Sequence, residues 1–97
     1  MHEPPWKIVY TKDALKDKKV AFEAGFAYKI NQLIELVAVD PFQKYPPYEK
    51  LLGDMLGAYS RRINIQHRFV YSVYLEERTV KVISLWNHYE SGLMQLM

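Results

Sequence analysis

The segment that decides the fold is YSRRINIQHRFVY, which spans Tyr59–Tyr71. It is typical of two antiparallel strands that are joined by a tight reversal. Arg62 and Arg68 lie at equal distances in sequence from Ile65. A reversal centred on Ile65 therefore places the two arginines opposite each other, with their Cβ atoms roughly 5 Å apart on one face of the sheet.

This predicted arginine pair has two interpretations. Like charges that lie directly opposite each other destabilise a sheet, and a bound phosphate offsets that cost because guanidinium groups bind phosphate through two parallel hydrogen bonds. Alternatively, Arg62 and Arg68 are two exposed arginines without a ligand. The segment by itself leaves both interpretations open.

Length and composition limit the classes of protein to which this chain can belong. A chain of 97 residues with 49% apolar and 25% charged residues is an ordinary globular protein, and we expect one domain over residues 1–97. Because the sequence contains no cysteine, it has no disulfide or thiolate metal site. It shows neither a signal-peptide pattern nor an apolar run of about 20 residues, so we expect a cytoplasmic protein that does not enter a membrane. The net charge of +2 is weak evidence for a nucleic-acid ligand.

The N-terminal part predicts one strand and one helix. Residues 6–10 alternate in polarity and are rich in β-forming residues, which predicts a strand. Thr11 provides an N-cap for a helix from Lys12 to about Ala24, and Gly25 provides a stop at its end. The apolar stripe of this helix is thin and consists of Ala14, Leu15, Ala21 and Phe22.

A second helix is predicted before Asp40, because the residue that precedes a proline is disfavoured in a helix. Its apolar residues have the i, i+3, i+4, i+7 spacing of one buried face, namely Ile30, Leu33, Ile34 and Val37. Residues 42–48 are interpreted as a rigid connection around Pro46-Pro47. A proline-rich recognition ligand is the less favoured interpretation, because the PxxP spacing is absent.

The second half of the chain is rich in β-forming residues. We expect strands at residues 59–64, 67–75 and 79–86, with a turn at residues 76–78. On the middle strand, one face would carry Phe69, Tyr71, Val73 and Leu75. The predicted fold is therefore α+β, with two N-terminal helices packed on a twisted, mainly antiparallel sheet of about four strands.

Few residues are candidates for chemistry. His88 follows the last predicted strand, and a histidine can exchange a proton near neutrality, although one between aromatic residues is more often structural. Glu49 alone is an ordinary solvated carboxylate. If Glu49, His88 and the arginine pair meet over one sheet face, they supply a base, an acid and two cations for phosphodiester cleavage. Neither a metal-ligand spacing nor a glycine-rich phosphate loop is present, so we expect no cofactor.

The motifs have a specific combined spacing. Tyr59–Ile63 (YSRRI), His67–Tyr71 (HRFVY) and the terminal His88-Tyr89 resemble the Txe/YoeB family of RelE-like toxins, from bacterial toxin–antitoxin pairs. The resemblance extends to Tyr48–Leu51 and Lys7–Thr11 and so covers nearly the whole domain. It implies a RelE-like, microbial-ribonuclease-like fold. It also implies an endoribonuclease that inhibits translation by cleaving mRNA in the ribosomal A site, through attack of a ribose 2′-OH on the adjacent phosphate.

The resemblance also assigns roles to individual residues. Glu49 corresponds to the general base of the family, and His88 to the general acid. Arg62 and Arg68 correspond to the phosphate-binding arginines, and Tyr89 corresponds to a tyrosine that helps to position the substrate.

Two further residues, Lys50 and Arg61, are expected to bind RNA. The family has a lysine three residues after the base, where this chain has Leu52. Whether Lys50 takes over the role of that lysine is left open. Residues 90–97 extend past the terminal motif and are expected to pack on the domain, to contact a second subunit or to be disordered.

The expected partners follow from the resemblance. They are the ribosome, its mRNA, a YefM/Axe-like antitoxin encoded beside this chain and a possible second copy of the chain. The alternative is a catalytically inactive RelE-like module that binds RNA or a partner without cleavage. Codon preference and the identity of the antitoxin are left open.

Overall fold

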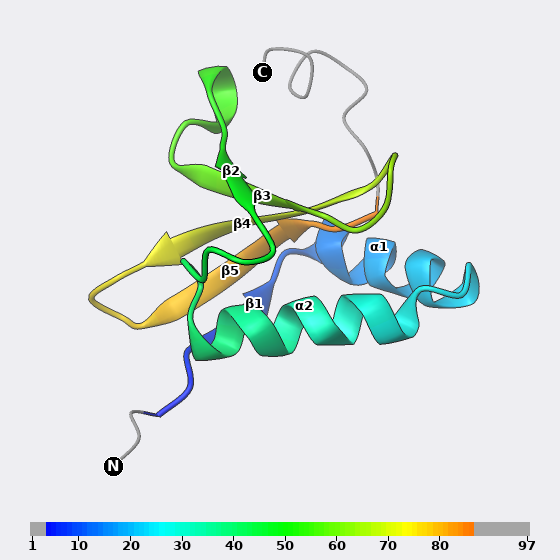
Figure 1. The fold of residues 1–97 in the computed structure, drawn as a ribbon, viewed down its shortest axis with the longest axis horizontal. Helices are drawn as coiled ribbons and strands as arrows, with labels where there is room; N and C mark the ends of the chain where they lie inside the picture. The colour runs from blue at the N-terminus through cyan, green and yellow to red at the C-terminus, as the bar shows by residue number, and fades with distance from the viewer. Residues whose placement is uncertain (1–3, 87–97) are drawn as a thin grey trace.

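The computed structural model describes residues 4–86, which form five strands, two α-helices and one short 3₁₀ helix (Figure 1). In chain order the elements are β1 (Lys7–Tyr10), α1 (Lys12–Glu23), α2 (Ala27–Val39), β2 (Tyr48–Lys50), η1 (Gly53–Met55), β3 (Ala58–Arg62), β4 (Arg68–Tyr74) and β5 (Thr79–Ser84). His88, Tyr89 and residues 90–97 lie outside the described residues. Neither described α-helix is long and apolar enough to cross a membrane.

The five strands form one mixed sheet in the order β1-β5-β4-β3-β2. β1 is parallel to β5, and the other neighbours are antiparallel. The predicted α+β fold is confirmed, with five strands in place of about four. The additional strand is β2, which the sequence did not predict because three residues are too short to show an alternating pattern.

Both helices begin or end where the local sequence predicts. The Thr11 hydroxyl accepts a hydrogen bond from the Ala14 amide at 3.0 Å and donates one to the Ile83 carbonyl at 2.7 Å, so the cap of α1 is also fastened to β5. Gly25 follows the end of α1 with a φ of +95°, a conformation that favours glycine. α2 ends at Val39, and Asp40 is its extended C-cap residue before Pro41.

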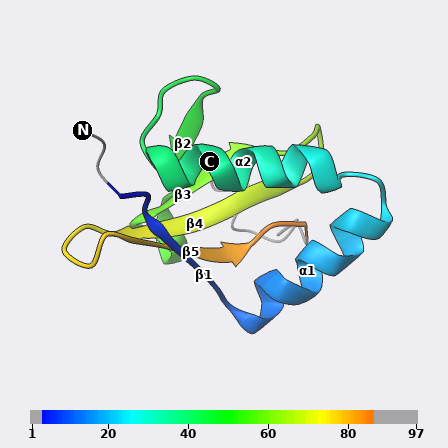
Figure 2. The ribbon, with the colours of Figure 1, turned by 90° about the horizontal axis from the view of Figure 1, so that it is seen from below.

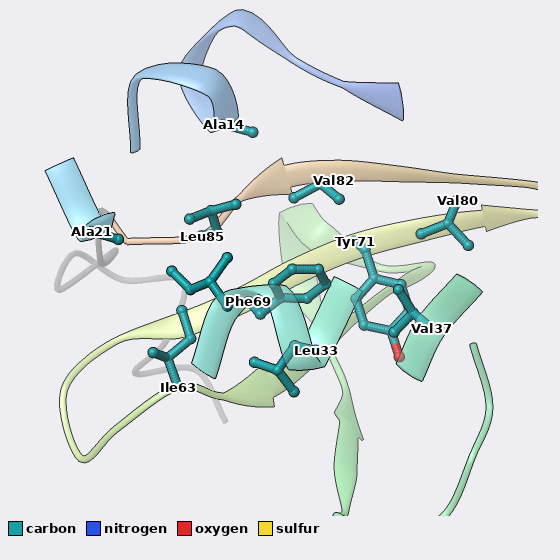
Figure 3. Packing of buried hydrophobic residues seen from close by; sticks show 11 residues of the cluster. Ala14, Ala21, Leu33, Val37, Ile63, Phe69, Tyr71, Val80, Val82 and Leu85 are labelled. Atoms are coloured by element: carbon teal, nitrogen blue, oxygen red, sulfur yellow. The ribbon is translucent and has the colours of Figure 1, made fainter. Parts of the chain in front are cut away.

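The main core lies between the helices and one face of the sheet (Figures 2 and 3). Its buried residues from α2 are Ile30, Leu33 and Val37, as the periodicity predicts. The sheet contributes Phe69, Tyr71, Val80 and Val82, and Figure 3 shows Phe69 and Tyr71 pointing toward α2.

Two side chains depart from the predicted apolar faces. Leu15 is 53% exposed, because it lies about 100° around α1 from the buried Ala14. The buried face of α1 contains Asp17 in its place, at the i, i+3, i+7 spacing with Ala14 and Ala21. Leu75 is also exposed, because β4 ends at Tyr74 and Leu75 already belongs to the turn.

Asp17 explains why β5 is shorter than predicted. Its carboxylate oxygen Oδ2 accepts a hydrogen bond from the Leu85 amide at 3.1 Å. That amide is therefore bonded to α1 and not to a neighbouring strand, and the strand ends at Ser84. The buried carboxylate fixes the end of β5 against the first helix.

A second, smaller cluster covers part of the opposite sheet face. It contains Leu51, Ala58 and Val70, with Met55 and Ile83 partly buried beside it. These residues bring η1 and the segment after β2 over one end of that face. The β3–β4 hairpin lies toward the other end, where the polar side chains described below are grouped.

Candidate functional site

The β3–β4 hairpin has the register that the sequence predicts. Arg62 pairs directly with Arg68, so the two arginines face each other at the end of the ladder. Asn64 shapes the reversal, because its Oδ1 accepts hydrogen bonds from the Gln66 amide at 2.8 Å and the His67 amide at 2.7 Å. Ile65 is exposed at the tip of the hairpin.

The edge strand β2 brings Glu49 to the same sheet face. Glu49 pairs with Ser60, and side-chain alternation places Glu49, Ser60 and Arg62 on the side turned away from the helices. Arg68 Nη1 donates hydrogen bonds to Glu49 Oε1 at 3.1 Å and to Ser60 Oγ at 3.2 Å. Arg68 is thus held in place by two neighbours, while the Glu49 side chain stays 54% exposed.

These residues line a cleft of about 380 Å³ at the edge of the sheet. Pairing between β2 and β3 begins at Tyr48 and Arg61, so the end of β3 extends past the edge strand at this point. The complete lining consists of Lys29, Pro46, Pro47, Glu49, Ser60, Arg62, Ile63 and Arg68.

The cleft carries positive charge that the described part of the chain does not balance. Arg68 forms an ion pair with Glu49. Within residues 4–86, Arg62 and Lys29 have neither a hydrogen bond nor an ion pair of their side chains. Such a site attracts an anion. In the same part of the chain, no three histidine, aspartate or glutamate side chains lie together as metal ligands would.

Arg61, which the sequence suggested as an RNA-binding residue, is buried and does not line the cleft. It alternates with Arg62 and points to the helix face, where only 1% of it is exposed. Its guanidinium donates to the carbonyls of Pro41, Gln43 and Pro46 at 2.7–3.1 Å and to the Tyr71 hydroxyl at 3.0 Å. Arg61 therefore fastens the connection after α2 to the sheet.

Burial raises the pKa of Tyr71 to about 12, although the neighbouring Arg61 guanidinium lowers it. An unfolded chain releases the tyrosine proton near pH 10. Because folding favours the neutral phenol, its contribution to stability is complete below about pH 10 and is lost as the pH rises toward 12.

We expect Tyr71→Phe to unfold more easily at neutral pH but to lose less stability over this alkaline range. Urea unfolding at several pH values tests this, with the exposed Tyr45→Phe as the control. Equal alkaline losses in the parent and Tyr71→Phe would contradict the assignment.

Lys50 is not part of the cleft. It follows Glu49 on β2 and alternates to the other face, where it lines a separate hollow with Leu52, Leu56 and Tyr59. Lys50 therefore places no positive charge in the cleft, and Leu52, which stands at the position of the family lysine, is uncharged. A contact between the exposed Lys50 and RNA stays a prediction.

Sequence reasoning missed two contributions to this region. Lys29 reaches the cleft from α2, and no motif connects it with Glu49 or the arginines. His67 and Trp86 stack with ring centroids 3.6 Å apart and an interplanar angle of 7°. This stacking fastens Trp86, which follows β5 and stands two residues before His88 in the sequence, against the β3–β4 hairpin. Only a tertiary contact reveals either feature.

Fold and cleft together define a small α+β protein with a cationic cleft at one edge of its sheet. The family model of YoeB-like toxins of bacterial type II toxin–antitoxin systems matches residues 10–89. The chain therefore belongs to this toxin family.

Similar proteins agree with this membership. The toxin YoeB of Synechocystis sp. is 40% identical over 62 residues, which are 64% of this chain and 70% of that protein. A YoeB/ParE toxin from Agrobacterium tumefaciens has a solved structure with a TM-score of 0.78 and 36% identity, over 86% of this chain and 99% of that one. The YoeB–YefM complex from Staphylococcus aureus gives a TM-score of 0.74 and 31% identity, over 87% and 98% of the two chains.

Proposed function

We propose that this toxin is a ribosome-dependent mRNA endoribonuclease that works in the cytoplasm and inhibits translation. The observation that carries the proposal is the meeting of Glu49, Arg62 and Arg68 at one cleft in a member of the YoeB-like family. A carboxylate beside two guanidinium groups matches the needs of phosphodiester cleavage by an internal nucleophile.

In the proposed reaction, Glu49 removes the proton of a ribose 2′-OH. Its Oε1 accepts the Arg68 hydrogen bond, and Oε2, which has no hydrogen-bond partner within residues 4–86, would take the proton. The 2′ oxygen attacks the adjacent phosphorus, and Arg62 and Arg68 stabilise the additional negative charge of the pentacovalent transition state. The bond to the 5′ oxygen then breaks, which leaves a 2′,3′-cyclic phosphate and a 5′-hydroxyl end.

The remaining roles fall on the C-terminal motif. His88, in its protonated form, would donate a proton to the departing 5′ oxygen, and Tyr89 would help to position the RNA. Both residues lie outside the described part of the chain, so these roles rest on the family motif. The modest net charge of +2 suits an enzyme whose substrate is held and shaped by the ribosome.

The direct test uses purified protein, ribosomes programmed with a short mRNA and analysis of the cleaved ends. Cleavage that depends on the ribosome and leaves a 2′,3′-cyclic phosphate is the expected result. Intact mRNA together with tight binding would instead support the alternative of an inactive RNA- or partner-binding module. Production of the protein without a partner provides a second readout, because an active toxin arrests growth.

Arg68→Lys is expected to lower the single-turnover cleavage rate by about 10²-fold or more while ribosome binding changes only a few-fold. In this structure a single guanidinium nitrogen, Nη1, contacts both Glu49 and Ser60. Lysine keeps the charge, but it lacks the further guanidinium nitrogens that would bind phosphate at the same time. The rate and the binding constant are measured on the same programmed ribosomes. Equal losses in both would show an ordinary binding arginine.

A YefM-like antitoxin is the proposed partner that silences this toxin. This proposal is based on the solved YoeB–YefM complex of the Staphylococcus aureus relative. A disordered segment with carboxylate side chains that folds across Arg62, Arg68 and Lys29 would block the cleft and neutralise its charge. A dimer is proposed on similar grounds, because a YoeB dimer from the same organism matches with a TM-score of 0.74.

A further inference from the structure

Lys29 is the one described lysine that lines the cleft. It lies in the first turn of α2, immediately before Ile30, which is fully buried in the core. The backbone that carries Lys29 is therefore fixed, whereas its side chain is partly exposed and has no hydrogen-bond partner within residues 4–86. Lysines in such a position keep the stem against apolar surface and the ammonium group in water.

The electrostatic setting of Lys29 differs from that of Arg68. Glu49 already balances the charge of Arg68, so Lys29 and Arg62 account for the uncompensated charge of the cleft among the described residues. Gathering two unpaired cations at one cleft costs free energy in the absence of a ligand. A bound phosphate group removes that cost.

We propose that Lys29 is a third phosphate-binding residue of the cleft and that it binds RNA in the ground state as strongly as in the transition state. This inference rests on the proposed ribonuclease function and adds to it a residue from α2. Lys29 supplies a lysine to the cleft from α2, whereas Lys50 lines a separate hollow.

The division of roles follows from how each cation is held. Arg68 is fixed by Glu49 and Ser60, and a preorganised donor favours the transition state for which it is placed. Lys29 is a hydrated point charge on a flexible stem, which follows the phosphate oxygens in both states. Interactions of equal strength in both states improve binding but leave the chemical step unchanged.

The first experiment measures binding of a short RNA, made uncleavable by 2′-O-methyl groups, to the free protein at several salt concentrations. Loss of one phosphate contact on single-stranded RNA reduces the slope of log K against log salt by about 0.7. We expect Lys29→Gln to show this reduction together with binding about three- to tenfold weaker at low salt. Lys29→Arg keeps the charge and should restore most of the binding.

Lys16→Gln is the matched control, because Lys16 is an exposed residue of α1 that loses the same charge outside the cleft. The inference is overturned if Lys29→Gln and the parent have the same slope, if Lys16→Gln lowers the slope equally, or if the parent does not bind the RNA at low salt. Melting curves of the variants show whether each is folded.

The second experiment measures single-turnover cleavage on programmed ribosomes. Lys29→Gln should require a several-fold higher enzyme concentration for half-maximal rate, with a nearly unchanged rate at saturation. A lower rate at saturation would overturn the assignment of Lys29 to binding. If the parent binds RNA with a slope that depends on Lys29 but cleaves nothing, the ribonuclease proposal fails while the phosphate site stands.

Discussion

Glu49→Gln is expected to slow cleavage of ribosome-bound mRNA by about 10²- to 10⁴-fold, and His88→Ala is expected to have an effect of similar size. Glutamine preserves the shape of the Glu49 side chain but cannot accept the proton of the 2′-OH. The side chain is 54% exposed, so the fold should tolerate the change. Glu35→Gln removes a carboxylate from the exposed side of α2 and is the matched control.

A chemically modified mRNA separates the two roles. When sulfur replaces the 5′ bridging oxygen of the scissile linkage, the leaving group departs as a thiolate and needs no general acid. His88→Ala should then cleave the sulfur-containing linkage at close to the parent rate, whereas Glu49→Gln should stay slow on both linkages. If both variants respond alike to the sulfur substitution, the assignment of base and acid is wrong.

Among the substitutions proposed for this protein, Arg61→Met is expected to lower the free energy of unfolding most. Its side chain is the buried donor for three carbonyls and for the Tyr71 hydroxyl, and its guanidinium carbon lies 4.8 Å from the centroid of the Tyr48 ring. A hydrogen bond from a charged group contributes about 1.5–3 kcal/mol, so loss of these bonds should cost more than about 3 kcal/mol in total. For a domain of this size, the corresponding fall in Tm is more than about 10 °C.

The adjacent Arg62→Met is the matched control for that experiment. Arg62 is exposed and has no partner among the described residues, so its replacement should change Tm little and impair cleavage. Thermal unfolding followed by circular dichroism measures the difference between the two variants. If Arg62→Met is as unstable as Arg61→Met, the division between a structural and a functional arginine is wrong.

Local sequence alone determined the helices and the hairpin. Thr11 and Gly25 bound α1, Asp40-Pro41 ends α2, and the symmetric spacing of Arg62 and Arg68 predicts their register. These features depend on backbone preferences and short-range periodicity, which residues close together in the sequence determine. The fold class follows from the order of the predicted elements.

Tertiary structure decided the rest. β2 is too short to be recognised from its own residues and exists because β3 offers it a paired edge. That edge brings Glu49 to Arg68. Alternation along β3 puts Arg61 and Arg62 on opposite faces, and the packing of the helices on one face decides that Arg61 is the buried one. Lys29 comes to the cleft because Ile30 buries its helix in the core. The sequence could not predict this placement, because it depends on how α2 packs against a sheet formed mainly by residues later in the chain.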